Sequence, residues 1–315
     1  MKNIFKKTII TMCSAVMLMG ISSVGVYAGR AEVGDFKIDR SYSYGSYTTQ
    51  IISYKGKGGE ITLPATAEID GTEYQVTEVG NAFKANEQIT GVTIPEGYTD
   101  ITASAFEGCT NLKSVSVPGT LTMISSSAFK NCPVLETVTF AESDKASLLF
   151  RNDVFADCTS LTSIKLPKQL SSADNNFLRG CTSLTSITVA DGTENFAVDD
   201  NILYDISGTG AVMTAYPYGR QETEFTIPVS ACGKTVTKIG PHLFKENGTL
   251  KQITVPETVT SIDRYAFNGM TAIEKIILEH ETAPELSSEV CTEMNPGSKV
   301  IVKNDDVAKA FESTS

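Results

Sequence analysis

The sequence has no tryptophan, only two histidines (His242 and His280) and no Cys-x-x-Cys pair. A structural zinc site or histidine-based catalysis therefore has few residues to use. It also has no Gly-x-Ser-x-Gly, no phosphate-binding glycine loop and no His-Glu-x-x-His. The acidic group around 199–205 lacks the Gly and Glu positions of a calcium loop. We therefore predict that the protein is not an enzyme, has no catalytic residues, and uses neither a metal nor a cofactor.

Basic residues are also in the minority, with 26 Lys and Arg against 37 Asp and Glu and a formal net charge of −11. An acidic surface repels nucleic acid and anionic membranes. The charge therefore predicts that neither is a partner.

Residues 1–28 have the composition of a signal peptide. Three lysines within residues 2–7 precede an apolar stretch (8–26), and Val-Tyr-Ala ends at position 28, which suits cleavage before Gly29. Removing these lysines leaves 23 basic against 37 acidic residues, a charge of −14. We expect a secreted or cell-surface protein with no membrane span after leader removal, although an uncut leader would be long enough to act as an anchor.

The most informative feature of the sequence is an internal repeat. Seven segments follow the pattern Leu-x-x-Ile-x-Ile, often ending in Pro, and begin at residues 89, 112, 135, 161, 184, 250 and 273. Their starts are 23, 23, 26, 23, 66 and 23 residues apart. A second phase, Val-x-x-Ile, recurs after the first, and a third phase, Ala-Phe-x-x-Cys, closes the unit.

A unit of 23 residues is too short to bury its own apolar side chains, so the copies must stack. This predicts a mainly β repeat solenoid with parallel first-phase strands on one wall, shorter second-phase strands opposite, and the third phase as a single helical turn. The predicted core consists of Leu112, Val115, Val117, Phe106, Phe129, Phe155, Phe267, Cys109, Cys132, Cys158 and Cys181.

This unit resembles that of the BspA-like leucine-rich repeat proteins of bacterial cell surfaces over about residues 59–280. The resemblance implies a right-handed leucine-rich repeat solenoid, and a role in surface attachment and contacts with host or microbial partners. The sequence departs from the unit where Ala141 and Ala190 replace the strand-ending Pro, where three extra residues occur within 141–154, and where one residue is displaced before Cys181.

We divide the chain into a signal peptide (1–28), a β cap with a first partial repeat (29–88), the leucine-rich repeats (89–272), and a last repeat with a C-terminal cap (273–315). An elongated repeat carrying β-hairpins interrupts the array at 191–249. In the N-terminal cap, Asp70-Gly71 is a hairpin turn signal, and Tyr42, Tyr44 and Tyr47 are expected to shield the first repeat. A strand at 300–302 and a short helix at 305–311 are expected to close the other end.

The periodic cysteines are predicted to be buried free thiols rather than disulfides. Equivalent positions in stacked repeats lie about 4.8 Å apart, which exceeds the separation of about 3.8 Å between the Cβ atoms of a disulfide. Cys232 and Cys291 fall outside the period and have no assigned partner.

Two surfaces are candidates for binding. The outward positions of the first strands are rich in Ser and Thr, include no aromatic residue, and form the predicted concave wall with Thr93, Ser116, Thr139, Lys165 and Thr188. Simple strand propensity also explains this composition. The interruption brings Tyr216 and Tyr218 close to Arg220. If one ring is exposed there, Tyr218→Ala with Arg220→Ala weakens attachment without changing stability, whereas a packing role predicts lost stability.

The leading hypothesis is a monomeric, non-enzymatic extracellular or cell-surface module for binding or adhesion. Its partner would be a protein or glycan on a host or microbial surface. The alternative is a structural or assembly component of the bacterial envelope, and an enzyme is the most remote possibility.

Overall fold

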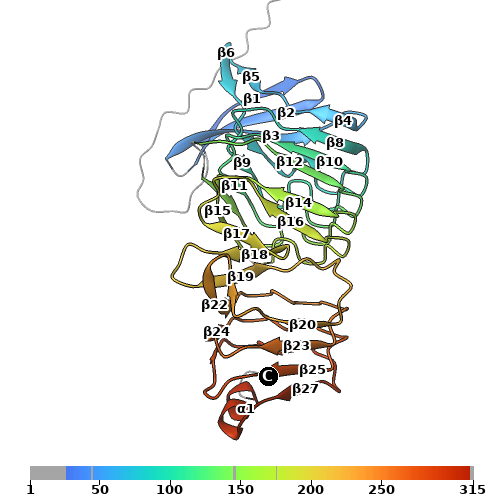
Figure 1. Cartoon of the computed structure of the whole chain (residues 1–315). Coiled ribbons are helices and arrows are strands. Elements are labelled where there is room, and N and C mark those ends of the chain that lie inside the picture. The colour runs from blue at the N-terminus through green and yellow to red at the C-terminus, as the bar shows by residue number, and fades with distance from the viewer. Residues whose placement is uncertain (1–25, 44, 145–146, 175, 313–315) are drawn as a thin grey trace, which may run out of the picture.

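The computed structural model describes residues 26–43, 45–144, 147–174 and 176–312, and the predicted leader up to residue 25 lies outside these ranges. The chain forms an elongated solenoid of two strand walls joined by short turns (Figure 1). This confirms the predicted repeat architecture. Within the described ranges no helix is both long and apolar enough to cross a membrane.

The first wall contains the Leu-x-x-Ile-x-Ile strands, and neighbouring strands within each of its three sheets run parallel. Its sheets are β4 (Gly59–Thr62), β8 (Ile89–Thr93), β10 (Ser114–Val117) and β12 (Thr137–Phe140); β14 (Ser163–Leu166) and β16 (Ser186–Val189); and β20 (Glu224–Thr226), β23 (Gln252–Val255), β25 (Lys275–Leu278) and β27 (Lys299–Ile301). The wall is therefore broken after β12 and after β16.

The second wall consists mostly of shorter strands. Its first sheet contains β7 (Glu78–Val79), β9 (Asp100–Ile101), β11 (Met123–Ile124), β13 (Leu148–Phe150) and β15 (Leu170–Ala173). Its second sheet contains β17 (Phe196–Asp199), β18 (Ile202–Asp205), β19 (Ala211–Ala215), β22 (Lys234–Ile239), β24 (Ser261–Ile262) and β26 (Glu285–Leu286), with β21 (Ser230–Ala231) paired to β22. The interruption therefore adds the antiparallel pairs β17–β18 and β18–β19 to this wall.

An antiparallel β cap extends the second wall at the N-terminal end. It consists of β1 (Val26–Val33), β2 (Phe36–Ser43) and β3 (Ser46–Tyr54), and β3 pairs with β7 of the first repeat. A separate hairpin, β5 (Thr66–Ile69) and β6 (Thr72–Gln75), turns at the predicted Asp70-Gly71. Both residues have positive φ (51° and 78°), the conformation that a two-residue hairpin turn of this kind requires.

The rings that shield the first repeat are not the predicted ones. Phe36 and Tyr54 pack against Phe83, with ring centroids 6.4 and 5.4 Å from it. Tyr42 and Tyr47 are instead 38% and 54% exposed, and the side chain of Tyr44 lies outside the described residues. The prediction was wrong for Tyr42 and Tyr47 because this cross-strand pair lies near the tip of the β2–β3 hairpin, whereas Phe36 and Tyr54 lie at its other end.

A column of stacked phenylalanine rings passes through the core. The centroids of Phe83 and Phe106, of Phe106 and Phe129, and of Phe129 and Phe155 are 5.0, 5.1 and 5.4 Å apart. The amide of Phe106 donates to the carbonyl of Ala128, the residue just before the ring position of the following repeat. The amide of Phe155 donates in the same way to the carbonyl of Phe177. The one-residue displacement therefore puts Leu178 in the ring position. All the core residues predicted from the sequence are at most 1% exposed.

The third phase forms tight turns, and among the described residues only the first of these turns is helical, as a 3-10 helix, η1 (Asn81–Phe83). In the regular turns the residue before the Ala-Phe pair has positive φ, as in Ser104, Ser127 and Tyr265 at 59–60°. A left-handed residue ends any right-handed helical path. The turns stack through backbone bonds, such as the Gly108 amide to the Lys130 carbonyl at 2.8 Å.

The four periodic cysteines are buried and unpaired. Each thiol donates to the carbonyl of the ring-position Phe in the preceding repeat: Cys109 to Phe83, Cys132 to Phe106, Cys158 to Phe129 and Cys181 to Phe155, at 3.0–3.3 Å. A thiol is a small apolar group with a weak donor, so it suits a buried position beside a carbonyl.

Two repeats have asparagine in the cysteine position. Asn86 accepts bonds from the Gln88 and Ile89 amides, and Asn247 accepts equivalent bonds from Thr249 and Leu250. Asn86 follows the N-terminal cap and Asn247 follows the interruption, so asparagine marks the first turn of each regular run. The buried side chains form two apolar clusters, and β18 and β19 each contribute side chains to both.

At the C-terminal end, β27 is followed by the only α-helix among the described residues, α1 (Asp305–Glu312), as the sequence predicts. Asn304 accepts bonds from the Asp306 and Val307 amides at its N-terminus. Val307 and Phe311 are the buried residues of this helix, and they cover the last repeat.

We expect Phe129→Ala to lower the free energy of unfolding by about 3–5 kcal/mol, because it removes a ring stacked on both sides. Phe129→Leu is the matched control. Leucine already fills the ring position at Leu178, so this change should cost about 1.5 kcal/mol or less. Urea denaturation measures both, and equal losses would contradict the assigned stacking.

The four periodic thiols should resist labelling in the folded protein. Burial raises the pKa of Cys181 to about 12, so little thiolate exists at neutral pH. A maleimide reagent should leave all four unmodified under native conditions and modify all four in denaturant, as measured by peptide mass. Bridged peptides among the four would contradict the hydrogen bonds to the phenylalanine carbonyls.

Candidate functional site

The outward positions of the first wall form a continuous row over its first four strands. Thr62, Thr93, Ser116 and Thr139 are aligned in register across β4, β8, β10 and β12, and all four side chains are exposed. Alternation explains the row, because successive residues of a strand point to opposite faces. The structure therefore presents four hydroxyl groups in one line at the spacing of the strands.

A shallow groove lies along this row. Its floor is lowered at Gly91, where a Cβ atom would approach Ser114 Oγ within 2.9 Å and Glu60 Cγ within 3.2 Å. The residues that line it are Glu60, Ile61, Thr62, Gly91, Val92, Thr93, Ser114, Val115, Ser116 and Thr139. The groove can therefore offer hydrogen bonds and one exposed carboxylate, Glu60, to a ligand lying across the strands.

The hydroxyl row does not continue unchanged along the wall. Lys165 and Thr188 are paired across β14 and β16 and are exposed, but no strand pairing joins β14 to β12. In the last sheet the aligned residues are Thr226, Thr254, Ile277 and Ile301. Thr254 is buried, at 9% exposure. The five predicted outward residues are thus all exposed, but they lie in two separate sheets.

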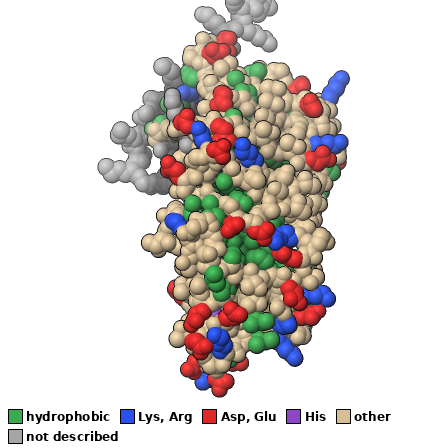
Figure 2. All heavy atoms as spheres, viewed as in Figure 1, with side chains coloured by type: hydrophobic (Ala, Val, Ile, Leu, Met, Phe, Trp, Pro, Cys, Tyr) green, Lys and Arg blue, Asp and Glu red, His purple; other side chains and the backbone are tan. Residues whose placement is uncertain are grey.

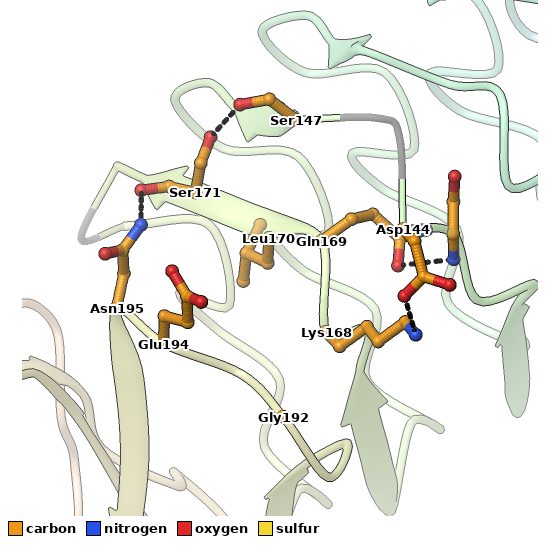
Figure 3. A pocket seen from close by; sticks show the side chains of 10 residues that line it. Asp144, Ser147, Lys168, Gln169, Leu170, Ser171, Gly192, Glu194 and Asn195 are labelled. Atoms are coloured by element: carbon orange, nitrogen blue, oxygen red, sulfur yellow. Dashed lines mark hydrogen bonds and ion pairs between the residues drawn. The ribbon is translucent and has the colours of Figure 1, made fainter.

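A second hollow lies in the connections that follow the strands of the first wall (Figure 3). Its polar groups bond mainly to one another: Asp144 pairs with Lys168, and Ser147 donates to Ser171 at 2.8 Å. Asn195 donates to the Ser171 carbonyl at 3.2 Å. These groups join neighbouring repeats, so the hollow has few groups available to a ligand.

The aromatic residues of the interruption are packed rather than displayed. Tyr216 is 2% exposed, contacts the rings of Phe225 and Phe244 at 5.3 and 5.2 Å, and donates to Glu222. Tyr218 is partly buried. The expectation of an exposed ring beside Arg220 was wrong, because both tyrosines pack toward the following repeat turn.

Tyr218 occupies a place that a repeat turn would otherwise fill. Its hydroxyl lies 2.8 Å from the Lys245 carbonyl and 3.4 Å from the Leu243 carbonyl. The corresponding carbonyls of a regular repeat, those of Ala128 and Lys130, accept from backbone amides of the preceding turn. The single O–H of this phenol thus takes the place of a backbone donor, chiefly toward the Lys245 carbonyl, and burial raises the pKa of this hydroxyl.

Close backbone packing holds the Tyr218 segment in place. The Gly219 amide donates to the Leu184 carbonyl at 2.7 Å, and a Cβ atom at Gly219 would lie 2.6 Å from the Ser183 carbonyl carbon. Only glycine allows this approach. Arg179 also bridges the interruption, pairing with Glu246 at 2.6 Å.

Arg220 stabilises the interruption rather than offering a free cation. It pairs with Asp200 at 2.9 Å and with Glu222 at 2.8 Å, and its side chain is 18% exposed. Asp200 belongs to the turn between β17 and β18, so this pair ties two parts of the interruption together. Among the described residues, no group of three His, Cys, Asp or Glu side chains is arranged to hold a metal ion.

Two arginines, Arg40 and Arg151, have no ion pair with any described residue, and Arg40 lies in the N-terminal cap. Arg40 on β2 contacts the rings of Tyr47 and Tyr74. The sequence feature that marks this contact is the Ser- and Tyr-rich stretch at 41–48, whose tyrosines are expected from the sequence to shield the first repeat.

Two strand walls, short turns and stacked rings together define a leucine-rich repeat solenoid. Residues 78–205 and 218–302 match the BspA-type leucine-rich repeat region in six copies, and the chain belongs to this family. The unmatched residues 206–217 lie within the interruption.

Solved structures of bacterial proteins share the fold. The pneumococcal vaccine antigen PcpA is similar at 17% identity over 92% of this chain and 97% of that one, with a TM-score of 0.58. A leucine-rich repeat protein of Eubacterium ventriosum is similar at 20% identity over 91% of this chain and 80% of that one, with a TM-score of 0.53. No curated protein matches the sequence.

Tyr218→Phe should lower the free energy of unfolding by about 1–3 kcal/mol, because it removes the hydroxyl that donates to the Lys245 carbonyl. Tyr47→Phe, which removes an exposed hydroxyl, is the control and should leave stability unchanged. The pair Tyr218→Ala and Arg220→Ala should likewise lower the melting temperature. Urea denaturation and thermal melting test these expectations, and an unchanged Tyr218→Phe variant would contradict the role of the phenol.

Proposed function

We propose that the chain is a non-enzymatic binding protein of the bacterial cell surface that contacts a protein or glycan through its first wall. The observation that carries this proposal is the exposed row Thr62, Thr93, Ser116 and Thr139 with the groove beside it. A row of hydroxyls along a rigid sheet can form many hydrogen bonds over a long footprint.

The composition of the row sets the expected kind of binding. It has no aromatic and no arginine, the residues that supply most of the energy in tight protein interfaces. Charges of both signs are interspersed over the face seen in Figure 2. Each contact is therefore weak, and affinity comes from their number.

A surface location is supported by two features of the sequence. The leader-like residues 1–28 would direct the chain to export, and the family to which it belongs is associated with bacterial cell surfaces. Export places the first wall where host or microbial molecules can reach it.

The test is binding of the exported chain, residues 29–315, to an array of immobilised extracellular-matrix proteins, glycans and bacterial envelope fractions. Thr93→Glu with Ser116→Glu puts two carboxylates on adjacent paired strands and should reduce binding at least about tenfold, by repulsion and lost hydrogen bonds. The control, Thr122→Glu with Thr260→Glu, adds the same charge at exposed positions beside the second wall.

Melting temperatures separate binding from folding, since both variants alter exposed residues. Binding that survives Thr93→Glu with Ser116→Glu would exclude the first wall as the contact. Binding to envelope fractions alone would favour a structural role in the envelope, and no binding by the wild-type chain would refute the proposal.

A further inference from the structure

An aromatic patch lies at the N-terminal end of the solenoid, away from the first-wall row. Tyr42 and Tyr47 are directly opposite each other on β2 and β3, with ring centroids 4.8 Å apart. They are 38% and 54% exposed, and they are the only exposed aromatic side chains among the described residues. The two rings are tilted by 57° to each other, and neither belongs to the buried core.

Arg40 belongs to the same patch. Its guanidinium carbon lies 4.0 Å from the centroid of the Tyr47 ring and 4.0 Å from that of Tyr74. Tyr47 comes from the β2–β3 hairpin and Tyr74 from the β5–β6 hairpin, which lie together at one end of the molecule (Figure 1). Two independent hairpins therefore hold one guanidinium group in place.

The electrostatic setting of Arg40 differs from that of most other arginines. Arg30, Arg179, Arg220 and Arg264 each pair with at least one carboxylate. Arg40 has no ion pair and no side-chain hydrogen bond to any described residue, although acidic residues outnumber basic ones 37 to 26. The leader, residues 1–28, has no Asp or Glu, so it offers no side-chain carboxylate.

A guanidinium stacked on tyrosine rings keeps its N–H donors in its own plane, where they can reach a ligand. Five donors in a rigid fork match the two oxygens of a carboxylate, and the neighbouring rings limit the conformational freedom lost on binding. Tyrosine and arginine are enriched in the residues that dominate protein interfaces. Tyr and Ser also dominate antibody paratopes, as they do residues 41–48 here.

We propose that Arg40, Tyr42, Tyr47 and Tyr74 form a docking site for an acidic segment of a partner protein, in which a Glu or Asp carboxylate pairs with Arg40 and a neighbouring apolar side chain packs on Tyr42 and Tyr47. The inference rests on the proposed function, because it names a second contact of the same binding protein. It adds a site that the hydroxyl row cannot supply, namely a compact one with arginine and aromatic anchors.

The experiment selects peptides from a random dodecapeptide phage library on the exported chain, residues 29–315. Selected peptides should contain Asp or Glu next to an apolar or aromatic residue. They should bind Arg40→Gln and Tyr47→Ser at least about tenfold more weakly than wild type, and Arg40→Lys should also bind weakly because lysine lacks the fork. Binding should weaken with added salt.

Arg264→Gln is the matched control. Arg264 also lies over a tyrosine ring, at 4.8 Å from Tyr265, but Glu289 is its partner at 3.4 Å. This variant loses the same charge and should bind the peptides within about twofold of wild type. Melting temperatures show whether each variant is folded, and Tyr42→Ser provides a further variant on the same patch if Arg40→Gln is unstable.

Peptides without an acidic consensus, or equal binding to Arg40→Gln and wild type, would overturn the proposal. Arg40-dependent binding to sialylated or sulfated glycans, without acidic peptides, would overturn it in favour of a glycan ligand. The proposed function of the first wall would be refuted by a different result. Thr93→Glu with Ser116→Glu should bind the peptides normally, and absence of array binding by the wild-type chain would refute the first-wall function whatever the peptides show.

Discussion

Stacking of one turn on the next is the constraint on which this structure depends. A unit of 23 residues has no second layer of its own, so each turn must present its ring, its thiol and its backbone carbonyls to a neighbour. The same residues contact both neighbouring turns. Phe106 lies between Phe83 and Phe129, and the thiol of Cys132 donates to the carbonyl of Phe106. The same atoms that complete one repeat therefore provide the surface on which the next one forms.

The interruption shows how much irregularity this constraint permits. The chain can leave the repeat for antiparallel hairpins, provided that the carbonyls of the next turn still find donors. Tyr218 supplies such a donor, Arg179 carries an ion pair across the gap, and Asn247 begins the next run as Asn86 began the first. Residues that looked like an interaction site in the sequence are thus committed to joining two stacks.

The periodic features could be predicted from the sequence because each of them is local and repeated. The spacing of Phe129 and Cys132 is enough to place them in a shared core, and the alternation of a strand is enough to turn Thr93 and Ser116 outward. What could not be predicted depends on contacts between distant segments. Tyr218 is covered by a turn about 25 residues further on. Phe36 and Tyr54, rather than Tyr42 and Tyr47, cover the first repeat because of where the cap hairpin meets Phe83. The amino-acid composition of the cap hairpin and of the Tyr218 segment does not indicate which of their rings are buried.

The broken first wall has a mechanical consequence. Backbone hydrogen bonds join the strands of each sheet, but no strand pairing connects β12 to β14 or β16 to β20. A load applied along the solenoid is shared by the two walls. The second wall crosses both places without a break, because β13 pairs with β15 and because β17, β18, β19 and β22 are joined in one sheet. The two walls are therefore interrupted at different levels, so the opposite wall carries the load past each break, and the row Thr62 to Thr139 stays within one sheet.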